Sequence, residues 1–247
     1  METLFISDLH LSPERPDKLE LFKQFIRGPA RACRALYILG DLVEEFWVGN
    51  DDRTPPNPQI IEELAGFTSS GKQLYFVRGN RELMLDNSFE TLTGCTVLQD
   101  PSIIDLDGNK VLIMHGDRLC SRDRTYQLYR KFMESTPVKK LFGILPYRIR
   151  ILLSHGLRPL MKKSSDFKSP GIIDADQKTI EETMQSYNVT ELIHGHTHRP
   201  GIHDFELAGR QARRIVLGDW YDQDSVLVCR DNDRRLVSIR DYLASSA

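Results

Sequence analysis

The sequence predicts an α/β (α+β) fold, a four-layer αββα sandwich of two mixed β-sheets with a helical insertion that forms a cap. Apolar strand runs alternate with amphipathic helices in the first half of the chain, as they do in β-α-β units. After residue 200, short strands alternate with turn residues, which is typical of a β-meander. The 247 residues, 40% of them hydrophobic, suffice for a single domain over 1–247 that includes the insertion.

The elements of the N-terminal half follow one another in strand–helix order. An apolar run at 4–11 predicts a buried strand. Apolar residues from Leu19 to Ile26 recur at helical spacing, so a helix is expected over 17–34. The next elements are expected to be a strand at 35–39, a helix from 60 to 71 and a strand at 74–77. In sheets built this way, ligands bind at the carboxyl ends of the strands.

The second half begins with a hairpin and a long helical stretch. Apolar runs at 102–106 and 111–114 flank the turn residues 107–109 and predict a hairpin. Residues from about 122 to 171 have a helical pattern without a convincing strand. They are expected to form an inserted lid over the carboxyl ends of the strands, where a ligand site is expected. The remaining elements are expected to be a helix at 176–187 and strands at 190–193, 202–207, 214–217, 225–229 and 236–240.

Side chains that can bind metal follow five of the expected strands. In an extended strand, residues i and i+2 point to the same side, so Asp8 and His10 can converge on one point. The other strand ends present groups of the same kinds. The full set of candidate ligands is Asp8, His10, Asp41, Asn80, His115, His196 and His198.

These candidate ligands offer oxygen and imidazole nitrogen but no thiolate. That mixture suits Mn²⁺, Fe²⁺ or Zn²⁺ better than Mg²⁺ or Ca²⁺. Seven ligands exceed the needs of one ion with open positions, whereas two ions that share a bridging carboxylate would use them all. Two-metal sites suit in-line attack on phosphorus, so the ligand set favours a hydrolase that cleaves phosphate bonds.

The ordered blocks Asp8-x-His10, Gly40-Asp41, Gly79-Asn80-Arg81-Glu82, His115-Gly116 and Gly195-His196-x-His198 resemble those of the calcineurin-like metallophosphoesterases. The resemblance implies two divalent ions, with Mn²⁺ preferred. One ion would be held by Asp8, His10, Asp41 and His198, and the other by Asp41, Asn80, His115 and His196. Asp41 would bridge the two ions. Catalytic roles are implied for Asp41, Asn80, Arg81 and His115.

Within this family, the sequence is most similar to the UDP-2,3-diacylglucosamine hydrolases of lipid A synthesis. The similarity runs nearly end to end and includes the block Ile215-Val216-Leu217-Gly218-Asp219-Trp220. It implies that hydroxide held on metal attacks the α-phosphorus of UDP-2,3-diacylglucosamine, which gives UMP and 2,3-diacylglucosamine 1-phosphate (lipid X). It also implies substrate contacts by Asn80, Arg81, Asp123, Tyr126, Ser165, Lys168 and His196.

Arg81 bears on which bond is cleaved. Phosphomonoesterase and phosphodiesterase relatives usually have a histidine at this position, which protonates an alkoxide leaving group. Arginine cannot act as that acid. A departing phosphate has a low pKa and needs less help, and a fixed guanidinium can stabilise its growing charge. Arg81 therefore favours cleavage between two phosphates.

Basic and apolar residues alternate over 139–168, where Asp166 is the single acid. A helical segment of this kind can lie on an anionic membrane and also wall an acyl groove. We therefore expect two partners, the UDP-linked acylated glucosamine substrate and the cytoplasmic face of the inner membrane. The alternative is that these basic residues form only the outer face of amphipathic helices packed on the core.

Composition limits the other partners and the location. The formal net charge of -2 gives no global attraction to nucleic acid, and no protein partner is predicted. The four cysteines lack C-x-x-C spacing and no leader pattern opens the chain, so a cytoplasmic location is expected. The basic, apolar segment over 139–168 adds the expectation of peripheral attachment to the inner membrane. Uncharged apolar runs fall short of the roughly 18 residues that a spanning helix needs.

Some residues have a second interpretation. The acidic residues of the 44–52 loop are expected to lie in a solvated connection and not to bind metal. His194 is expected either to pack in the core or to support a neighbouring ligand. Trp47 and Trp220 are expected in the core or lining a pocket.

The chain also departs from the narrower family's pattern. Glu82 stands where aspartate is usual, the 43–52 loop has one extra residue, and Met161 stands where a serine is common. These departures leave two alternatives open: another nucleotide pyrophosphate or phosphodiester as substrate, or a binding module that no longer catalyses. Loss of ligands would mark such a module, and none of the candidate ligands is missing.

Overall fold

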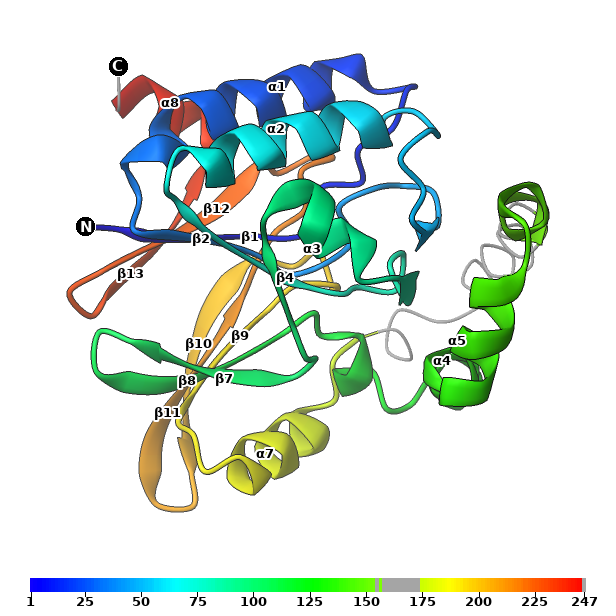
Figure 1. Cartoon of the computed structure of the whole chain (residues 1–247). Coiled ribbons are helices and arrows are strands. Elements are labelled where there is room, and N and C mark those ends of the chain that lie inside the picture. Colours follow the sequence, from blue (N-terminus) through cyan, green and yellow to red (C-terminus); the bar gives the residue numbers. More distant parts are fainter. Residues whose placement is uncertain (154–155, 157–173, 246–247) are drawn as a thin grey trace.

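The computed structural model describes residues 1–153, 156 and 174–245, and it confirms the expected four-layer sandwich. Two sheets lie face to face, with α1, α2 and α8 outside one sheet and α7 outside the other (Figure 1). The helices α4 and α5 stand to one side of the sandwich. Each layer follows from a strand or helix that is apolar on the side it buries.

The first sheet has the strand order β13-β12-β1-β2-β4-β6. β1, β2, β4 and β6 are parallel, while β12 and β13 extend the sheet in antiparallel register. The carboxyl ends of β1, β2 and β4 therefore meet at one edge. The bounds are Thr3–Ile6 (β1), Ala35–Ile38 (β2), Gln73–Val77 (β4), Thr96–Leu98 (β6), Ser225–Arg230 (β12) and Asp233–Ser238 (β13).

The second sheet has the strand order β10-β11-β9-β8-β7. β8, β9 and β11 are parallel, and β7 and β10 pair antiparallel at the two edges. The carboxyl ends of β8 and β9 therefore lie side by side. The bounds are Ser102–Leu106 (β7), Asn109–Met114 (β8), Glu191–His194 (β9), Gly201–Leu207 (β10) and Arg210–Val216 (β11).

The helices and the short elements complete the described chain. A small two-stranded sheet pairs β3 (Val48–Gly49) with β5 (Met84–Leu85). Short 3-10 helices span η1 (Pro29–Ala32) and η2 (Asp117–Leu119). The α-helices are α1 (Pro16–Arg27), α2 (Asn57–Ser69), α3 (Ser88–Thr93), α4 (Arg124–Glu134), α5 (Thr136–Ile144), α7 (Gln177–Ser186) and α8 (Ile239–Ser245).

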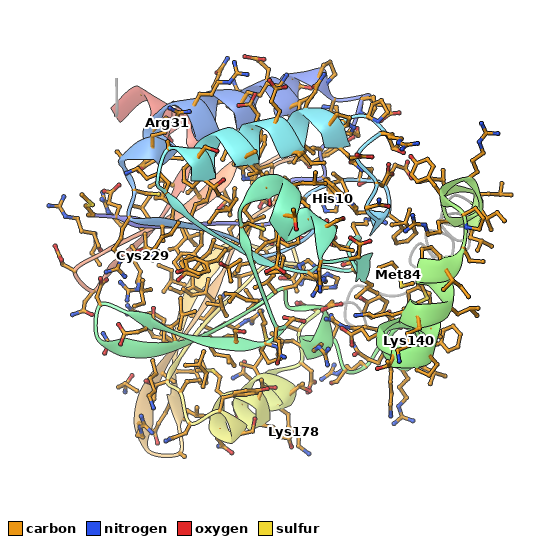
Figure 2. The ribbon with its side chains drawn as sticks, in the orientation of Figure 1. His10, Arg31, Met84, Lys140, Lys178 and Cys229 are labelled. Atoms are coloured by element: carbon orange, nitrogen blue, oxygen red, sulfur yellow. The ribbon has the colours of Figure 1, made fainter. Side chains whose placement is uncertain are left out.

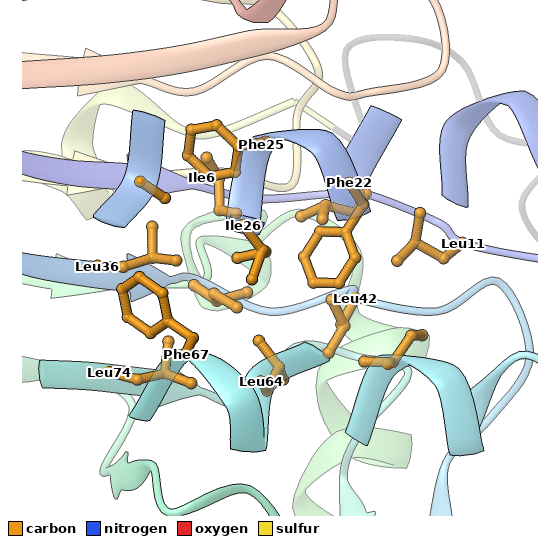
Figure 3. Packing of buried hydrophobic residues seen from close by; sticks show 14 of the residues in the cluster. Ile6, Leu11, Phe22, Phe25, Ile26, Leu36, Leu42, Leu64, Phe67 and Leu74 are labelled. Atoms are coloured by element: carbon orange, nitrogen blue, oxygen red, sulfur yellow. The ribbon is translucent and has the colours of Figure 1, made fainter. Parts of the chain in front are cut away.

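Three apolar clusters hold the layers together. Figure 3 shows Ile6, Leu36 and Leu74 of the first sheet in one cluster with Phe22 of α1 and Phe67 of α2. A second cluster fills the space between the sheets, and a third joins α7 to the second sheet. Burial of these side chains is the main favourable term in folding, roughly 1.5–3 kcal/mol for each large one. The ligand-bearing strand ends thus project from a packed support.

Several expected element boundaries were wrong. α1 ends at Arg27 instead of continuing to 34, because Gly28 and Pro29 interrupt the helix before η1. Strand β13 ends at Ser238, and the following residues form α8. The tail strands do not form one meander. They form two hairpins, β10–β11 and β12–β13, which belong to different sheets.

The expected lid is described in part. Helical residues occupy 124–134, 136–144 and 147–153, in agreement with the helical pattern expected there. In the part of the chain that the structure describes, no helix combines the length and the apolar character needed to cross a bilayer.

Candidate metal centre

Each candidate ligand lies just beyond the carboxyl end of a strand, and the two sheets bring these ends to one place. Asp8 and His10 follow β1, Asp41 follows β2, and Asn80 follows β4. The second sheet adds His115 after β8, and His196 and His198 after β9. Backbone hydrogen bonds lock neighbouring ends together, for example from His10 N to Asp41 O at 3.0 Å and from Gly195 N to His115 O at 2.8 Å.

Five of the candidate ligands have an unusual backbone conformation. Positive φ angles occur at Asp8 (55°), His10 (47°), Asp41 (50°), His196 (69°) and His198 (53°). The left-handed region costs a residue with a Cβ about 1–3 kcal/mol, and such residues cluster at functional sites. The sharp turns at these residues aim successive side chains inward instead of alternating them along a strand.

Two glycines allow the loops after β2 and β4 to approach each other. Gly40 has φ of +85°, and a Cβ there would lie 2.5 Å from the Cα of Gly79. A Cβ on Gly79 would overlap Oδ1 of Asp41. Glu82 ties the same loops together, because its buried carboxylate accepts hydrogen bonds from the backbone N–H groups of Asp41, Leu42 and Gly79.

The side chain of Glu82 is fully buried, and this affects its ionisation. Burial, followed by the nearby charge of Asp41, raises the pKa of Glu82 to about 7. The three N–H donors oppose that rise by stabilising the carboxylate. Glu82 stands where aspartate is usual in the narrower family. Its carboxylate bonds to the backbone of both loops, the one after β2 and the one after β4.

Asp8 is held as a carboxylate by its neighbours. Its Oδ2 accepts hydrogen bonds from Ser7 Oγ at 2.6 Å and from His196 N at 2.8 Å, and its Oδ1 lies 3.3 Å from His198 Nε2. Burial alone would raise the pKa of Asp8. The hydrogen bond with His198 and the charges of His115 and His10 outweigh burial and hold the pKa well below its usual range.

His115 presents one ring nitrogen to the site. Its Nδ1 lies 2.8 Å from Leu39 O, a contact that fixes the proton on Nδ1 and leaves a lone pair on Nε2. That Nε2 lies 3.0 Å from Asn80 Oδ1, 3.6 Å from Asp41 Oδ1 and 3.2 Å from His196 Nδ1. A cation would satisfy these converging lone pairs.

His10 is also oriented for a cation. Its ring is buried, and Nε2 has no hydrogen-bond partner among the described residues while lying 3.8 Å from Asp41 Oδ2. An unsatisfied buried nitrogen costs free energy unless a ligand or metal occupies the space in front of it. Ligand atoms of Asp8, His10 and His198 lie within 4.8 Å of one another, as do those of Asp8, Asp41 and His115. The donor set fits divalent metal ions.

Sequence reasoning missed two carboxylates behind the histidines. Glu44 Oε2 lies 3.0 Å from Nδ1 of His10, and Asp219 Oδ2 lies 3.5 Å from Nδ1 of His198. Carboxylates in this place orient metal-binding imidazoles. Asp219 belongs to the conspicuous 215–220 block, but no pattern in the sequence ties it to His198.

The acidic residues of the 44–52 loop were expected to be solvated, and this expectation was wrong for Asp51. The side chain of Asp51 is buried, 1% exposed, and Oδ1 accepts hydrogen bonds from Thr54 N at 3.0 Å and from Tyr147 Oη at 2.7 Å. Tyr147, in the helical residues that follow α5, therefore gives Asp51 a defined partner. Asp52 is exposed, as expected.

Arg81 lies at the rim of the centre. Its backbone N–H donates to Asp41 Oδ1 at 3.0 Å. Its guanidinium lies 3.7 Å from Glu44 and 5.6 Å from the ring centroid of Phe46. Its Nε is buried and has no hydrogen-bond partner among the described residues. Arg81 thus has donor capacity for an anionic ligand.

The expected substrate residues fall into two groups. Asp123 caps α4 by accepting from Tyr126 N at 3.1 Å, and the Tyr126 hydroxyl donates to Asp117. The Tyr126 ring stacks near His196, with centroids 6.4 Å apart. Ser165 and Lys168, like Met161, lie outside the described residues.

The residues with two interpretations now have defined places. His194 packs in the core, where Arg214 Nε donates to its Nε2 at 2.8 Å. Burial, followed by the charge of Arg214, lowers the pKa of His194 to about 3. Trp220 lies in the core beneath α1, and Trp47 lines an apolar pocket beside Arg81.

Comparison with known proteins agrees with this geometry. The family model for calcineurin-like phosphoesterases matches residues 1–200. A UDP-2,3-diacylglucosamine hydrolase of Aeromonas hydrophila is 42% identical over 96% of this chain and 98% of its own length. The enzyme of that name from Vibrio parahaemolyticus is 44% identical over 92% of this chain and 93% of its own.

Among solved structures, an archaeal phosphodiesterase aligns with 96% of this chain and 99% of its own, with a TM-score of 0.49 and 13% identity. The family model spans the strand ends that hold all the candidate ligands. The chain belongs to the calcineurin-like phosphoesterase family.

Proposed function

We propose that the protein hydrolyses the pyrophosphate bond of UDP-2,3-diacylglucosamine at the α-phosphorus, giving UMP and 2,3-diacylglucosamine 1-phosphate. The observation behind this proposal is the place of Arg81, whose backbone is bonded to Asp41 within the convergent ligand set. Relatives that are 42–44% identical over more than nine-tenths of the chain bear the corresponding name.

Two divalent ions, with Mn²⁺ as the preferred species, are proposed for the centre. One would be held by Asp8, His10, Asp41 and His198, and the other by Asp41, Asn80, His115 and His196. Bound metal activates water and polarises phosphoryl oxygens. Asp41 suits the bridging role because Oδ2 lies 3.8 Å from His10 Nε2 while Oδ1 lies 3.6 Å from His115 Nε2.

The protein's own side chains would position the substrate and stabilise the leaving group. Arg81 would bind the departing sugar phosphate through its guanidinium, whose fork matches phosphate oxygens. Asn80 and His196 would contact the α-phosphate. Asn80 would reach it from the first sheet and His196 from the second. Because the leaving phosphate has a low pKa, this arrangement needs no general acid at Arg81's position.

An apolar pocket beside Arg81 supports an acylated substrate. It lies between the 46–48 loop, the β5 strand and the helices α4 and α5. Its lining residues are Phe46, Trp47, Val48, Asn80, Arg81, Leu83, Met84, Tyr129, Met133 and Phe142. We place an acyl chain in this pocket, where burying each CH₂ contributes about 0.8 kcal/mol.

The described part of the cap also suits a membrane surface, and we propose peripheral attachment to the cytoplasmic face of the inner membrane. Seven of the thirteen exposed large hydrophobic side chains of the described residues fall between Leu128 and Leu153. The exposed basic residues Lys131, Lys139 and Lys140 belong to the same helices. Figure 2 shows Lys140 on α5. Exposed apolar and basic groups together favour anionic lipid.

The test uses three substrates with purified, Mn²⁺-loaded protein. UDP-2,3-diacylglucosamine should yield UMP. UDP-glucosamine without acyl chains should show a much lower kcat/KM, because binding energy from the chains contributes to the transition state. A phosphomonoester should not be cleaved. Equal rates on both UDP-sugars would instead identify a soluble nucleotide pyrophosphate as the substrate, and cleavage of the monoester alone would overturn the proposal.

A further inference from the structure

Glu44 touches both the metal centre and the arginine beside it. Its Oε2 lies 3.0 Å from His10 Nδ1 and its Oε1 lies 3.7 Å from a terminal nitrogen of Arg81. One carboxylate therefore spans two groups that the proposed reaction uses for different purposes. The side chain is one-third exposed, whereas the side chain of His10 is 9% exposed.

The backbone fixes Glu44 in this position. The N–H of Glu44 donates to Leu11 O at 3.1 Å, and the N–H of Leu11 donates to Leu42 O at 3.0 Å. Leu11 and Val43 form an isolated parallel bridge beyond the ends of β1 and β2. The pairing brings Glu44 beside His10 without depending on any contact of its carboxylate.

We propose that Glu44 is a positioning residue that couples His10 to Arg81. On the metal side, a carboxylate next to Nδ1 favours the proton on that nitrogen, which keeps the lone pair of Nε2 directed at the centre. Neither buried ring nitrogen of His10 makes a hydrogen bond among the described residues, so the 3.0 Å approach of Glu44 Oε2 to Nδ1 is an electrostatic contact, and Nε2 is the atom that would gain a cation.

On the phosphate side, Glu44 restricts the guanidinium of Arg81. The ring of Phe46 lies 5.6 Å from the guanidinium carbon, so Arg81 is held between an aromatic face and a carboxylate. Holding the fork in place lowers the entropy lost when it binds the leaving phosphate. This part of the inference rests on the proposed function, while the metal part does not.

A double-mutant cycle of three variants and one control variant test the coupling. Glu44→Gln keeps the size of the side chain and removes its charge, and it is made in the wild-type and Arg81→Ala backgrounds. The matched control is Asp52→Asn, which removes an exposed carboxylate from the same loop. Circular dichroism and thermal melting confirm that each variant is folded.

The first readout needs no substrate: the Kd for Mn²⁺ measured by calorimetry on metal-free protein. Glu44→Gln should weaken Mn²⁺ binding by about 10–100-fold in both backgrounds, the usual effect of losing a partner behind a metal-binding histidine. Asp52→Asn should leave the Kd unchanged. A Kd within twofold of wild type in Glu44→Gln would overturn the link to His10.

The second readout is kcat for the acylated substrate at saturating Mn²⁺. Glu44→Gln should lower kcat by about tenfold in the wild-type background and by less than twofold when Arg81 is alanine, because the group it positions is absent. Equal losses in both backgrounds would overturn the link to Arg81. If wild-type protein fails to cleave the substrate, the proposed function is wrong, and the Kd series still decides the role of Glu44 at His10.

Discussion

The backbone N–H of Arg81 donates a 3.0 Å hydrogen bond to Oδ1 of Asp41. The residue proposed to bind the leaving phosphate is thereby fixed to the carboxylate proposed to bridge the two ions. Any shift of the loop after β4 moves both groups together. This connection lies within the first sheet and would hold the leaving phosphate at a defined distance from the proposed metal ions.

Replacing Asp41, the carboxylate proposed to bridge the two ions, should weaken metal binding and remove most of the activity. Asp41→Asn keeps an acceptor for Arg81 N–H but removes the charge that two ions would share. Changes behind a metal ligand cost about 10–100-fold, so removing the charge of a ligand shared by two ions should lower kcat/KM by more than about 100-fold. Metal analysis should find fewer ions per chain than in wild type. Full activity in this variant would rule out a bridging role for Asp41.

Metal binding should stabilise the fold. Asp8 and Asp41 are both buried, 0% and 2% exposed, and their carboxylates repel each other without a cation between them. Mn²⁺ at about 100 times its Kd should add about 2.7 kcal/mol to the free energy of unfolding. Differential scanning calorimetry should show a higher Tm with Mn²⁺ than with a chelator. An unchanged Tm would mean that the folded site does not bind the ion.

Two glycine substitutions should have opposite effects. Gly79→Ala should destroy metal binding, because its Cβ would overlap Asp41 Oδ1 and lie 3.0 Å from the His115 ring. Gly66→Ala in α2 meets no atom within 4 Å and should stabilise the protein by about 0.5–1 kcal/mol. Urea unfolding and Mn²⁺ calorimetry measure the pair. Normal metal affinity in Gly79→Ala would contradict the close approach of the two loops.

A buried ion-pair network should make Arg130 important for stability. Its side chain, 2% exposed, donates to Asp117, to Asp100 and, through Nε at 3.2 Å, to Glu134. Arg130→Met would leave buried carboxylates without their shared cation, at a cost of about 3–5 kcal/mol. The control Arg230→Met breaks an exposed pair and should cost less than about 1 kcal/mol. Similar losses for both variants in urea unfolding would contradict this prediction.

The strand ends could be predicted from sequence because their chemistry is local. The apolar run before Asp8 marks a buried strand, which located Asp8 and His10 at its end. The expected same-side strand geometry was wrong, because β1 ends at Ile6 and both residues have positive φ angles. The pattern repeats before Asp41, Asn80 and His115, so the candidate metal centre could be located from short segments. The general αββα architecture was predictable for the same reason.

The remaining features depend on contacts between distant segments. Glu44 reaches His10 only because the chain pairs Leu11 with Val43, and Asp219 lies beside His198 because the β12 strand returns to the first sheet. Strand periodicity gives no partner, so the two tail hairpins could not be assigned to separate sheets in advance. The Asp8–His196 hydrogen bond joins residues 188 positions apart.

The most direct test of the proposed reaction is hydrolysis of UDP-2,3-diacylglucosamine in water enriched in oxygen-18, followed by mass spectrometry of both products. Attack at the α-phosphorus forms the new P–O bond on the nucleotide side. One heavy oxygen should therefore appear in UMP and none in 2,3-diacylglucosamine 1-phosphate. Heavy oxygen in the sugar phosphate, or no cleavage of this substrate, would contradict the proposed reaction.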